Sequence, residues 1–310
     1  MNRLLFFLLL FPLAAAAGGA EDYLAEIARQ RQAREEGLRQ PLGWLSLVGL
    51  HWIEPGSHRV GAASDSDIVL AVGPEHLGEI RLSEGVVTLV LAHAKGVEID
   101  GAPAAVGELA LRPDSRGEPT QVTFDGGAAG FNLIERDGRF ALRVRDARAR
   151  TRTAFAGLDY FDTDPAWRIE ARFELYKEGA TIEIANVIGQ LSPEPNPGAV
   201  VFDREGKTCR IEALANPDGS LFLIFADRTS GRETYGAGRF LDAPAPRDGR
   251  VTVDFNLAYN PPCAFNAFST CPLPPPENRL KLAVQAGEKK YAGPHRDAAS
   301  SADPAGPENR

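Results

Sequence analysis

The segment Trp167-Arg-Ile-Glu-Ala-Arg-Phe-Glu-Leu175 alternates apolar and charged residues along its length. A β-strand buried on one face requires this pattern, because successive side chains point to opposite sides of a sheet. Shorter alternating runs follow, and Leu221 to Phe225 is continuously apolar, as in a strand covered on both faces. Turn signals such as Pro217-Asp-Gly219 and Asp248-Gly249 separate these runs. The sequence therefore predicts a mainly β protein, with an antiparallel sandwich or barrel as its larger part.

Two β units preceded by a helix are expected in the body of the chain. Apolar residues recur at helical spacing near the start, which predicts a helix over residues 21–41. The turn-forming run Arg112-Pro-Asp-Ser-Arg-Gly117 interrupts the strand pattern that follows. We therefore predict a small β-sandwich module over residues 42–115 and a larger antiparallel β domain over residues 118–291.

The two ends of the chain differ in composition from this β core. Residues 1–20 combine the charge of Arg3, an apolar run and a small-residue stretch with A-x-A spacing. That is the pattern of a Sec-type signal peptide, and its apolar run is too short to span a bilayer. We therefore expect an exported protein, periplasmic or secreted, without a transmembrane anchor. Residues 292–310 are rich in Gly, Pro, Ala and Ser and are predicted to be a disordered tail.

The charge pattern argues against nucleic-acid binding. The formal net charge is −8, and no cluster of lysine and arginine interleaves with aromatic residues, so a phosphate backbone has no basic surface to bind. Zinc sites usually need four ligands from closely spaced pairs, and this pattern is missing from the sequence. We therefore predict no metal and no cofactor, and the sequence leaves any catalytic residue and the oligomeric state open.

Two cysteines lie close together near the C-terminus. Cys263 and Cys271 flank a proline-rich loop, and an exported protein normally meets oxidising conditions. A disulfide between them would stabilise the protein by roughly 2–3 kcal/mol on the chain-entropy model. A reduced pair packed in the core and a metal site are the alternatives. Cys209 alternates with Ile211 and is expected to be buried on a strand.

Candidate ligand-binding residues fall in two polar segments, each of which follows a strand. The first segment is rich in glycine, which allows a ligand to approach the backbone closely. In the second, Asp254 and Asn256 share one face of the predicted strand and its extension. Both segments can alternatively be ordinary loops whose polar groups satisfy their own backbone. The candidates are Asp227, Arg232, Glu233, Tyr235, Arg239, Asp254, Asn256, Tyr259 and Asn260.

Four blocks of sequence resemble the DUF1684 family, a bacterial family named as a domain of unknown function. The matching blocks are Gly43–Leu50, Phe161–Ala171, Phe225–Leu241 and Asp254–Leu280, and they are spread over most of the chain. The resemblance implies family membership and no established activity.

The segment from Gly56 to Gly61, with Ser66 to Leu70 and Asp100-Gly101, is similar in rhythm to a forkhead-associated sandwich. Such sandwiches bind phosphothreonine peptides. Here Ala62 stands where that family places an arginine, and the region of Glu75-His76 lacks its serine-arginine pattern. The resemblance therefore extends to the sandwich shape and not to phosphopeptide binding.

These observations lead to one main hypothesis and two alternatives. The larger domain is expected to bind a small polar ligand, such as a carbohydrate or cell-envelope fragment, between the 227–239 and 254–279 loops. The first alternative is a hydrolase using paired carboxylates among Asp227, Glu233 and Asp254, with His51 in a minor role. The second is a protein-interaction module in the N-terminal sandwich.

Overall fold

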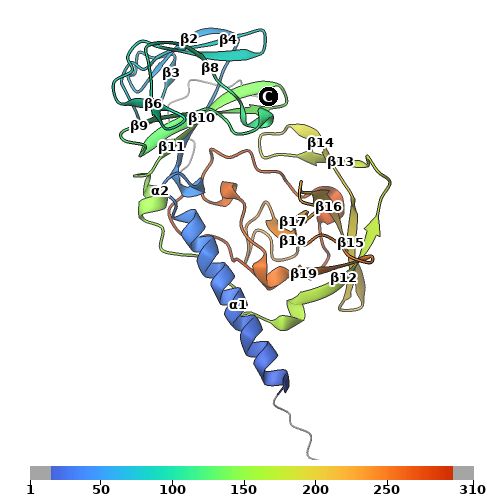
Figure 1. Ribbon diagram of the computed structural model, residues 1–310. Coiled ribbons are helices and arrows are strands. Elements are labelled where there is room, and N and C mark those ends of the chain that lie inside the picture. The colour runs from blue at the N-terminus through green and yellow to red at the C-terminus, as the bar shows by residue number, and fades with distance from the viewer. Residues whose placement is uncertain (1–14, 296–310) are drawn as a thin grey trace, which may run out of the picture.

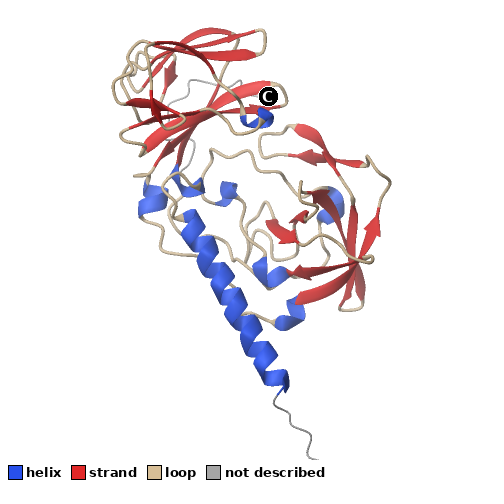
Figure 2. Ribbon diagram, viewed as in Figure 1, coloured by secondary structure: helices blue, strands red, loops and turns tan. Residues whose placement is uncertain are grey.

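The computed structural model describes residues 15–295 and shows a long N-terminal helix beside two β units (Figure 1, Figure 2). Strands account for 42% of the residues and helices for 15%, which confirms the mainly β prediction. Helix α1 spans Ala15–Leu38, and the short α2 spans Arg150–Thr153 between the two units. No helix of the described range is long and apolar enough to cross a membrane.

The first β unit consists of two facing sheets with one apolar core between them. Six strands form the first sheet, in the order β1 (Leu47–Trp52), β11 (Arg139–Asp146), β10 (Ala129–Arg136), β9 (Gln121–Phe124), β6 (Val97–Ile99) and β7 (Ala102–Pro103). Five strands form the second, in the order β3 (Ile68–Val69), β2 (Gly56–Gly61), β4 (Gly78–Ser83), β5 (Val86–Leu91) and β8 (Gly107–Ala110). All pairings are antiparallel except that of β2 with β3.

This unit extends beyond its predicted end. Strand β11 pairs with β1, and β9 pairs with β6, so residues 121–146 belong to the same sheet as residues 47–52. The predicted boundary between residues 115 and 118 therefore lies within the first unit. Its turn-forming residues make a connection between two strands of one sandwich, and such a connection has the same composition as a linker.

The larger unit is built around a six-stranded antiparallel sheet that curls until it is nearly closed like a barrel. Its order is β18 (Arg239–Ala243), β17 (Leu221–Phe225), β16 (Lys207–Ala215), β15 (Gly198–Arg204), β12 (Arg168–Leu175) and β19 (Arg250–Asp254). A separate hairpin pairs β13 (Thr181–Ala185) with β14 (Leu191–Pro195).

Strand β12 confirms the alternating pattern of residues 167–173, whereas Leu175 at its end is 78% exposed. Ala171 and Phe173 are buried in the core of the larger unit, whereas Arg172 is exposed. The strand pairs with β15 through Phe173 opposite Val200, and with β19 through Arg168 opposite Asp254. Asp254 therefore ends β19 at the edge of the sheet closest to α1, where Tyr23 of the helix reaches its carboxylate.

The ends of the chain are described only in part. Residues 15–20 of the predicted signal peptide belong to α1, and residues 1–14 lie outside the described residues. Of the predicted tail, residues 296–310 also lie outside them.

Candidate functional site

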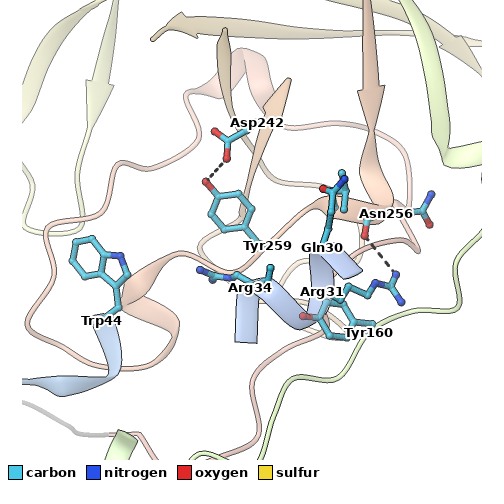
Figure 3. A pocket seen from close by; sticks show the side chains of 10 residues that line it. Gln30, Arg31, Arg34, Trp44, Tyr160, Asp242, Asn256 and Tyr259 are labelled. Atoms are coloured by element: carbon cyan, nitrogen blue, oxygen red, sulfur yellow. Dashed lines mark hydrogen bonds between the residues drawn. The ribbon is translucent and has the colours of Figure 1, made fainter. Parts of the chain in front are cut away.

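A cavity of about 540 Å³ lies between α1 and the larger β unit (Figure 3). Three aromatic side chains, two arginines and one buried amide contribute to its walls. The lining residues are Gln30, Arg31, Ala33, Arg34, Trp44, Tyr160, Asp242, Asn256, Leu257 and Tyr259.

Helix α1 docks beside this cavity through a mainly polar face. Tyr23, Ile27, Arg31, Arg34 and Leu38 are spaced three or four residues apart, so they share one side of the helix. Ile27 and Leu38 are buried, while the other three form hydrogen bonds with the larger unit. The position of the helix is therefore determined by directional polar contacts as well as by apolar packing.

Arg34 anchors the helix through a buried ion pair. Its Nε donates to Oε1 of Glu288 at 3.0 Å, its Nη2 donates to the carbonyl oxygen of Asn260 at 2.9 Å, and its guanidinium lies 4.9 Å from the ring centroid of Tyr259. The backbone N–H of Asn260 also donates to Oε2 of Glu288 at 2.7 Å. Burial raises the pKa of Glu288, against the opposing effect of Arg34. These contacts hold Arg34 and Tyr259 in fixed positions on the cavity wall.

Arg31 occupies the other end of the cavity. Its guanidinium stacks over the ring of Tyr160, with 4.4 Å to the centroid, and its Nη2 donates to the carbonyl oxygen of Phe161 at 3.2 Å. In Figure 3 Arg34 extends toward Trp44 and Arg31 extends toward Asn256. The two guanidinium groups therefore flank the cavity instead of meeting at one point. Burial lowers the pKa of Arg31 and raises that of Tyr160.

Asn256 lies at the base of the cavity, but its side-chain amide is fully buried and already bonded within the protein, to Tyr23 and Asp254 among others. It lies in the short 3-10 turn Phe255–Leu257, and Asp254 caps this turn by accepting the Asn256 amide N–H at 3.1 Å. The Asn256 side chain exchanges hydrogen bonds with the backbone of Asp164, at 2.8 and 3.1 Å. Tyr23 donates to the Asp254 carboxylate at 2.8 Å, and burial together with that carboxylate raises the pKa of Tyr23.

The mouth of the cavity is open and amphipathic. Trp44 is 38% exposed, which is unusual for so large an apolar ring in a folded protein. Across from it, Tyr259 donates its hydroxyl to Oδ2 of the exposed Asp242 at 3.0 Å. A flat or ring-shaped ligand could stack on these aromatic faces while its polar groups reach Asp242 and Gln30.

Comparison with known proteins identifies the family of the chain. The profile described as "Protein of unknown function (DUF1684)" matches residues 153–289, which contain β12 to β19 and the turn that carries Asn256. The protein belongs to the DUF1684 family. An uncharacterised protein of Haloarcula marismortui, solved by solution NMR, is 34% identical, and the match covers 44% of this chain and 77% of that one with a TM-score of 0.37. No protein of curated function matches the chain.

Two of the predicted ligand-binding residues of this DUF1684 protein are buried away from the cavity. Asp227 and Arg239 form an ion pair, with 2.9 Å between Oδ2 and Nη2, and both side chains are completely inaccessible to solvent. Arg239 also donates to the backbone oxygens of Val284, Ala286 and Glu288. The pair therefore tethers the C-terminal segment of the larger unit, and a ligand from solvent does not reach it.

The remaining residues of the first predicted segment also lie apart from the cavity lining. Glu233 accepts a hydrogen bond from the Gln285 side chain at 3.0 Å, and Arg232 donates to the carbonyl oxygen of Arg228 at 2.6 Å. The Tyr235 hydroxyl donates to the carbonyl oxygen of Cys263 at 3.0 Å. The 227–239 loop thus bonds most of its polar groups within the larger unit, as in the alternative interpretation of an ordinary loop, although the Nε of Arg239 is buried without a partner.

The second predicted segment does reach the cavity. Asn256 and Tyr259 line it, whereas Asp254 and Asn260 lie behind them as hydrogen-bond partners of α1. Arg31, Arg34 and Tyr160 were not among the sequence candidates. The available signal was the presence of both arginines on the helical face that also carries Ile27 and Leu38, because a charged residue on a buried face needs a specific partner.

The cysteines are free thiols in the structure. Cys263 and Cys271 are nevertheless adjacent, since the Cys263 amide N–H donates to the Cys271 sulfur at 3.2 Å. Their mutual hydrogen bond raises the pKa of Cys263 and lowers that of Cys271. Cys209 is buried in the core of the larger unit. Within the described residues no cluster of three or more histidine, cysteine, aspartate or glutamate side chains is arranged to hold a metal ion.

Proposed function

We propose that the protein binds a small, uncharged, ring-containing polar ligand, such as a carbohydrate, in the cavity beside α1. The observation that carries this proposal is the convergence of Trp44, Tyr160 and Tyr259 around about 540 Å³ of open space. Ligand sites of this size typically combine apolar and aromatic walls with a few fixed polar groups. Aromatic faces with polar edges suit sugar rings, which have apolar faces and hydroxyl rims.

The charge balance of the lining favours an uncharged ligand. The charge of Arg34 is offset by Glu288, with which it forms an ion pair. Arg31 and Asp242 carry opposite charges at different ends of the lining. The cavity as a whole therefore has little net charge with which to select an anion or a cation, while its donors and acceptors can still orient hydroxyl groups.

The hydrolase alternative receives less support from the same geometry. Paired-carboxylate hydrolysis needs two carboxyl groups on either side of one bond. Asp242 is the one carboxylate among the lining residues, and Tyr259 donates to it. Asp227 is bound to Arg239, and Asp254 accepts hydrogen bonds from Tyr23 and the Asn256 backbone. Binding is therefore the function that the site supports best.

The source of the ligand follows from the proposed location of the protein. We propose that the signal segment directs export, so that the ligand comes from the cell envelope or its surroundings. Cleavage after Ala17 or Ala20 would keep Tyr23, which bonds α1 to the larger unit, and all of the lining residues from Gln30 onward.

Calorimetric titration of the chain beginning at residue 21 tests the proposal. The probes are N-acetylglucosamine, glucose and maltose, together with glucuronate as a charged ring of similar size. Trp44→Ala removes an exposed wall of the cavity and should weaken binding of the best probe about tenfold or more, as expected for a central aromatic contact. Trp52→Ala is the matched control, since Trp52 packs under Arg139 with 4.7 Å to the ring centroid and is not a lining residue.

The titration distinguishes ligand binding in the cavity from binding elsewhere or no binding. Binding that is lost in Trp44→Ala and retained in Trp52→Ala supports the site. Failure of every probe, or equal binding by the wild type and Trp44→Ala, would show that the cavity is not a site for this class of ligand.

A further inference from the structure

Two arginines lie on the outer face of the sheet that contains β10 and β11. On β11, Leu142 and Val144 enter the apolar core of the first unit, so Arg143 and Arg145 lie on the opposite face. Their positions along the strand are about 7 Å apart. Figure 1 shows β10 and β11 on the side of the first unit that faces the larger unit. The two guanidinium groups therefore share one face near the junction of the units.

Among the described residues, neither arginine has a carboxylate within ion-pair distance, and each has one hydrogen-bond contact. Arg143 is only 5% exposed, and its Nη2 donates to the Thr270 hydroxyl oxygen at 3.3 Å. Arg145 donates through Nη1 to Oδ1 of Asn132, which lies opposite Arg143 on β10. The Nε atoms of both arginines are buried without a hydrogen-bond partner. Several donors of the pair are thus left unused.

The charge around this pair is unbalanced. Arg136 lies beside them, but Asp114 neutralises it through two hydrogen bonds of 2.9 Å. Burial, reinforced by Arg136 and Arg145, lowers the pKa of Arg143 to about 10, and burial also lowers the pKa of Arg145. Buried charges without a partner strongly destabilise a fold, and proteins ordinarily pair them. Asp114 also acts on Arg143 from a distance, but it is already paired with Arg136, so among the described residues no carboxylate is left to pair with Arg143 or Arg145.

We propose that Arg143 and Arg145 bind a small oxyanion, namely a phosphate, sulfate or carboxylate group, at the junction of the two β units. Planar guanidinium groups bind such anions through paired N–H donors, and the fixed positions of both arginines on one strand favour this geometry. Thr270 accepts hydrogen bonds from Arg136 and Arg143, at 3.2 and 3.3 Å, so its own hydroxyl proton is available to the anion. The side-chain nitrogen of Asn132 donates one hydrogen to the carbonyl oxygen of Leu133 at 3.3 Å and keeps a second hydrogen for the anion.

The anion would connect the two units, because Arg143 and Arg145 belong to the first and Thr270 to the loop of the second. It would also lie next to the ligand cavity, since the Arg143 guanidinium stacks against Trp44 at 5.6 Å from the ring centroid. The anion can therefore be a free inorganic ion or the acidic group of a larger molecule. The chemistry recognised by the arginines is the same in both cases, and the site does not depend on the ligand proposed above.

The test measures how the midpoint of thermal unfolding of the chain beginning at residue 21 responds to millimolar sodium phosphate. Sodium chloride at equal ionic strength is the reference, because salt screens charges in every variant. Arg145→Gln and Arg143→Leu each remove one donor group and should weaken the apparent phosphate affinity about tenfold or more. Arg139→Gln is the matched control, because Arg139 lies on the same strand but stacks on Trp52 at the exposed end of β11.

Saturable stabilisation by phosphate in the wild type and in Arg139→Gln, with loss in both cluster variants, would support the site. Two results would overturn the proposal: no saturable response in the wild type, or an equal response in all four proteins, which is the general salting-out effect of phosphate. A parallel titration with glucose 6-phosphate distinguishes the sources. Tighter binding than that of inorganic phosphate, dependent on Trp44, would assign the anion to a larger ligand, and equal binding would assign a free ion.

Discussion

The buried pair of Asp227 and Arg239 leads to the sharpest prediction about stability. Both side chains are fully inaccessible, and among the residues that the structure describes Asp227 is the one carboxylate within ion-pair distance of the guanidinium. Asp227→Asn keeps the shape of the side chain but removes the carboxylate that is hydrogen-bonded to Arg239, whose charge Glu288 and Glu233 then offset only from a distance. Breaking a buried ion pair from one side costs about 3–5 kcal/mol. For a chain of 310 residues that loss corresponds to a fall of about 5–8 °C in the midpoint of thermal unfolding.

Urea unfolding at pH 7 measures the free-energy change directly. Glu233→Gln is the matched control, because Glu233 carries the same kind of charge in the same loop but acts on Arg239 only from a distance. Its carboxylate accepts a hydrogen bond from the exposed Gln285 side chain, so the change should cost less than about 0.5 kcal/mol. The double variant Asp227→Leu with Arg239→Met should lose less than the sum of the two single changes, because it leaves no unpaired charge in the interior. A loss below about 1 kcal/mol in Asp227→Asn would refute the reasoning and return Asp227 to the list of ligand-binding candidates.

Three further predictions concern the rest of the larger unit and α1. Cys263 and Cys271 should form a disulfide under oxidising conditions, which mass spectrometry would detect as a protein lighter by two hydrogen atoms. Alkylation of both thiols in the unfolded, unreduced protein would contradict this prediction. Cys209→Ser should have no effect on the formation of the disulfide. Burial raises the pKa of Tyr160, Tyr235 and Tyr259, so these hydroxyls ionise more easily when unfolded, and stability should fall as the pH rises above 10 by up to about 1.4 kcal/mol per pH unit for each tyrosine. Tyr259→Phe should reduce that slope in alkaline urea titrations, and an unchanged slope would argue against the assignment. Tyr23→Phe should destabilise the protein by about 1–2 kcal/mol and increase amide hydrogen exchange in α1, because Asp254 loses a hydrogen bond; unchanged exchange would mean that the helix is held by its other contacts.

Much of the fold was predictable because it depends on local pattern. The alternation of residues 167–175 indicates which face of β12 is buried, and the spacing of apolar residues near the start of the chain predicts the N-terminal helix. The boundary between the units was not predictable in this way. Pairing of β11 with β1 joins residues almost a hundred positions apart in the chain, and a turn inside a sandwich has the composition of a linker.

The candidate site was predictable only for the residues of one segment. Asn256 and Tyr259 follow a strand and line the cavity, whereas Asp227 and Arg239, which have equally polar surroundings in sequence, pair with each other in the interior. Polarity marks residues that need partners, and it does not tell whether the partner is a ligand or another side chain of the protein.

The sequence by itself determined that this DUF1684 protein is mainly β with a helix at its N-terminus, because strand alternation and helical periodicity are local properties of the chain. Only the tertiary structure decided where its polar residues act. It brought Arg31 and Arg34 of α1 against Tyr160 and Tyr259, and placed Arg143 and Arg145 together at the junction with their Nε atoms unbonded within the described part of the chain. These groupings join segments that are distant in the chain, and a pattern of neighbouring residues does not record which distant charges meet after folding.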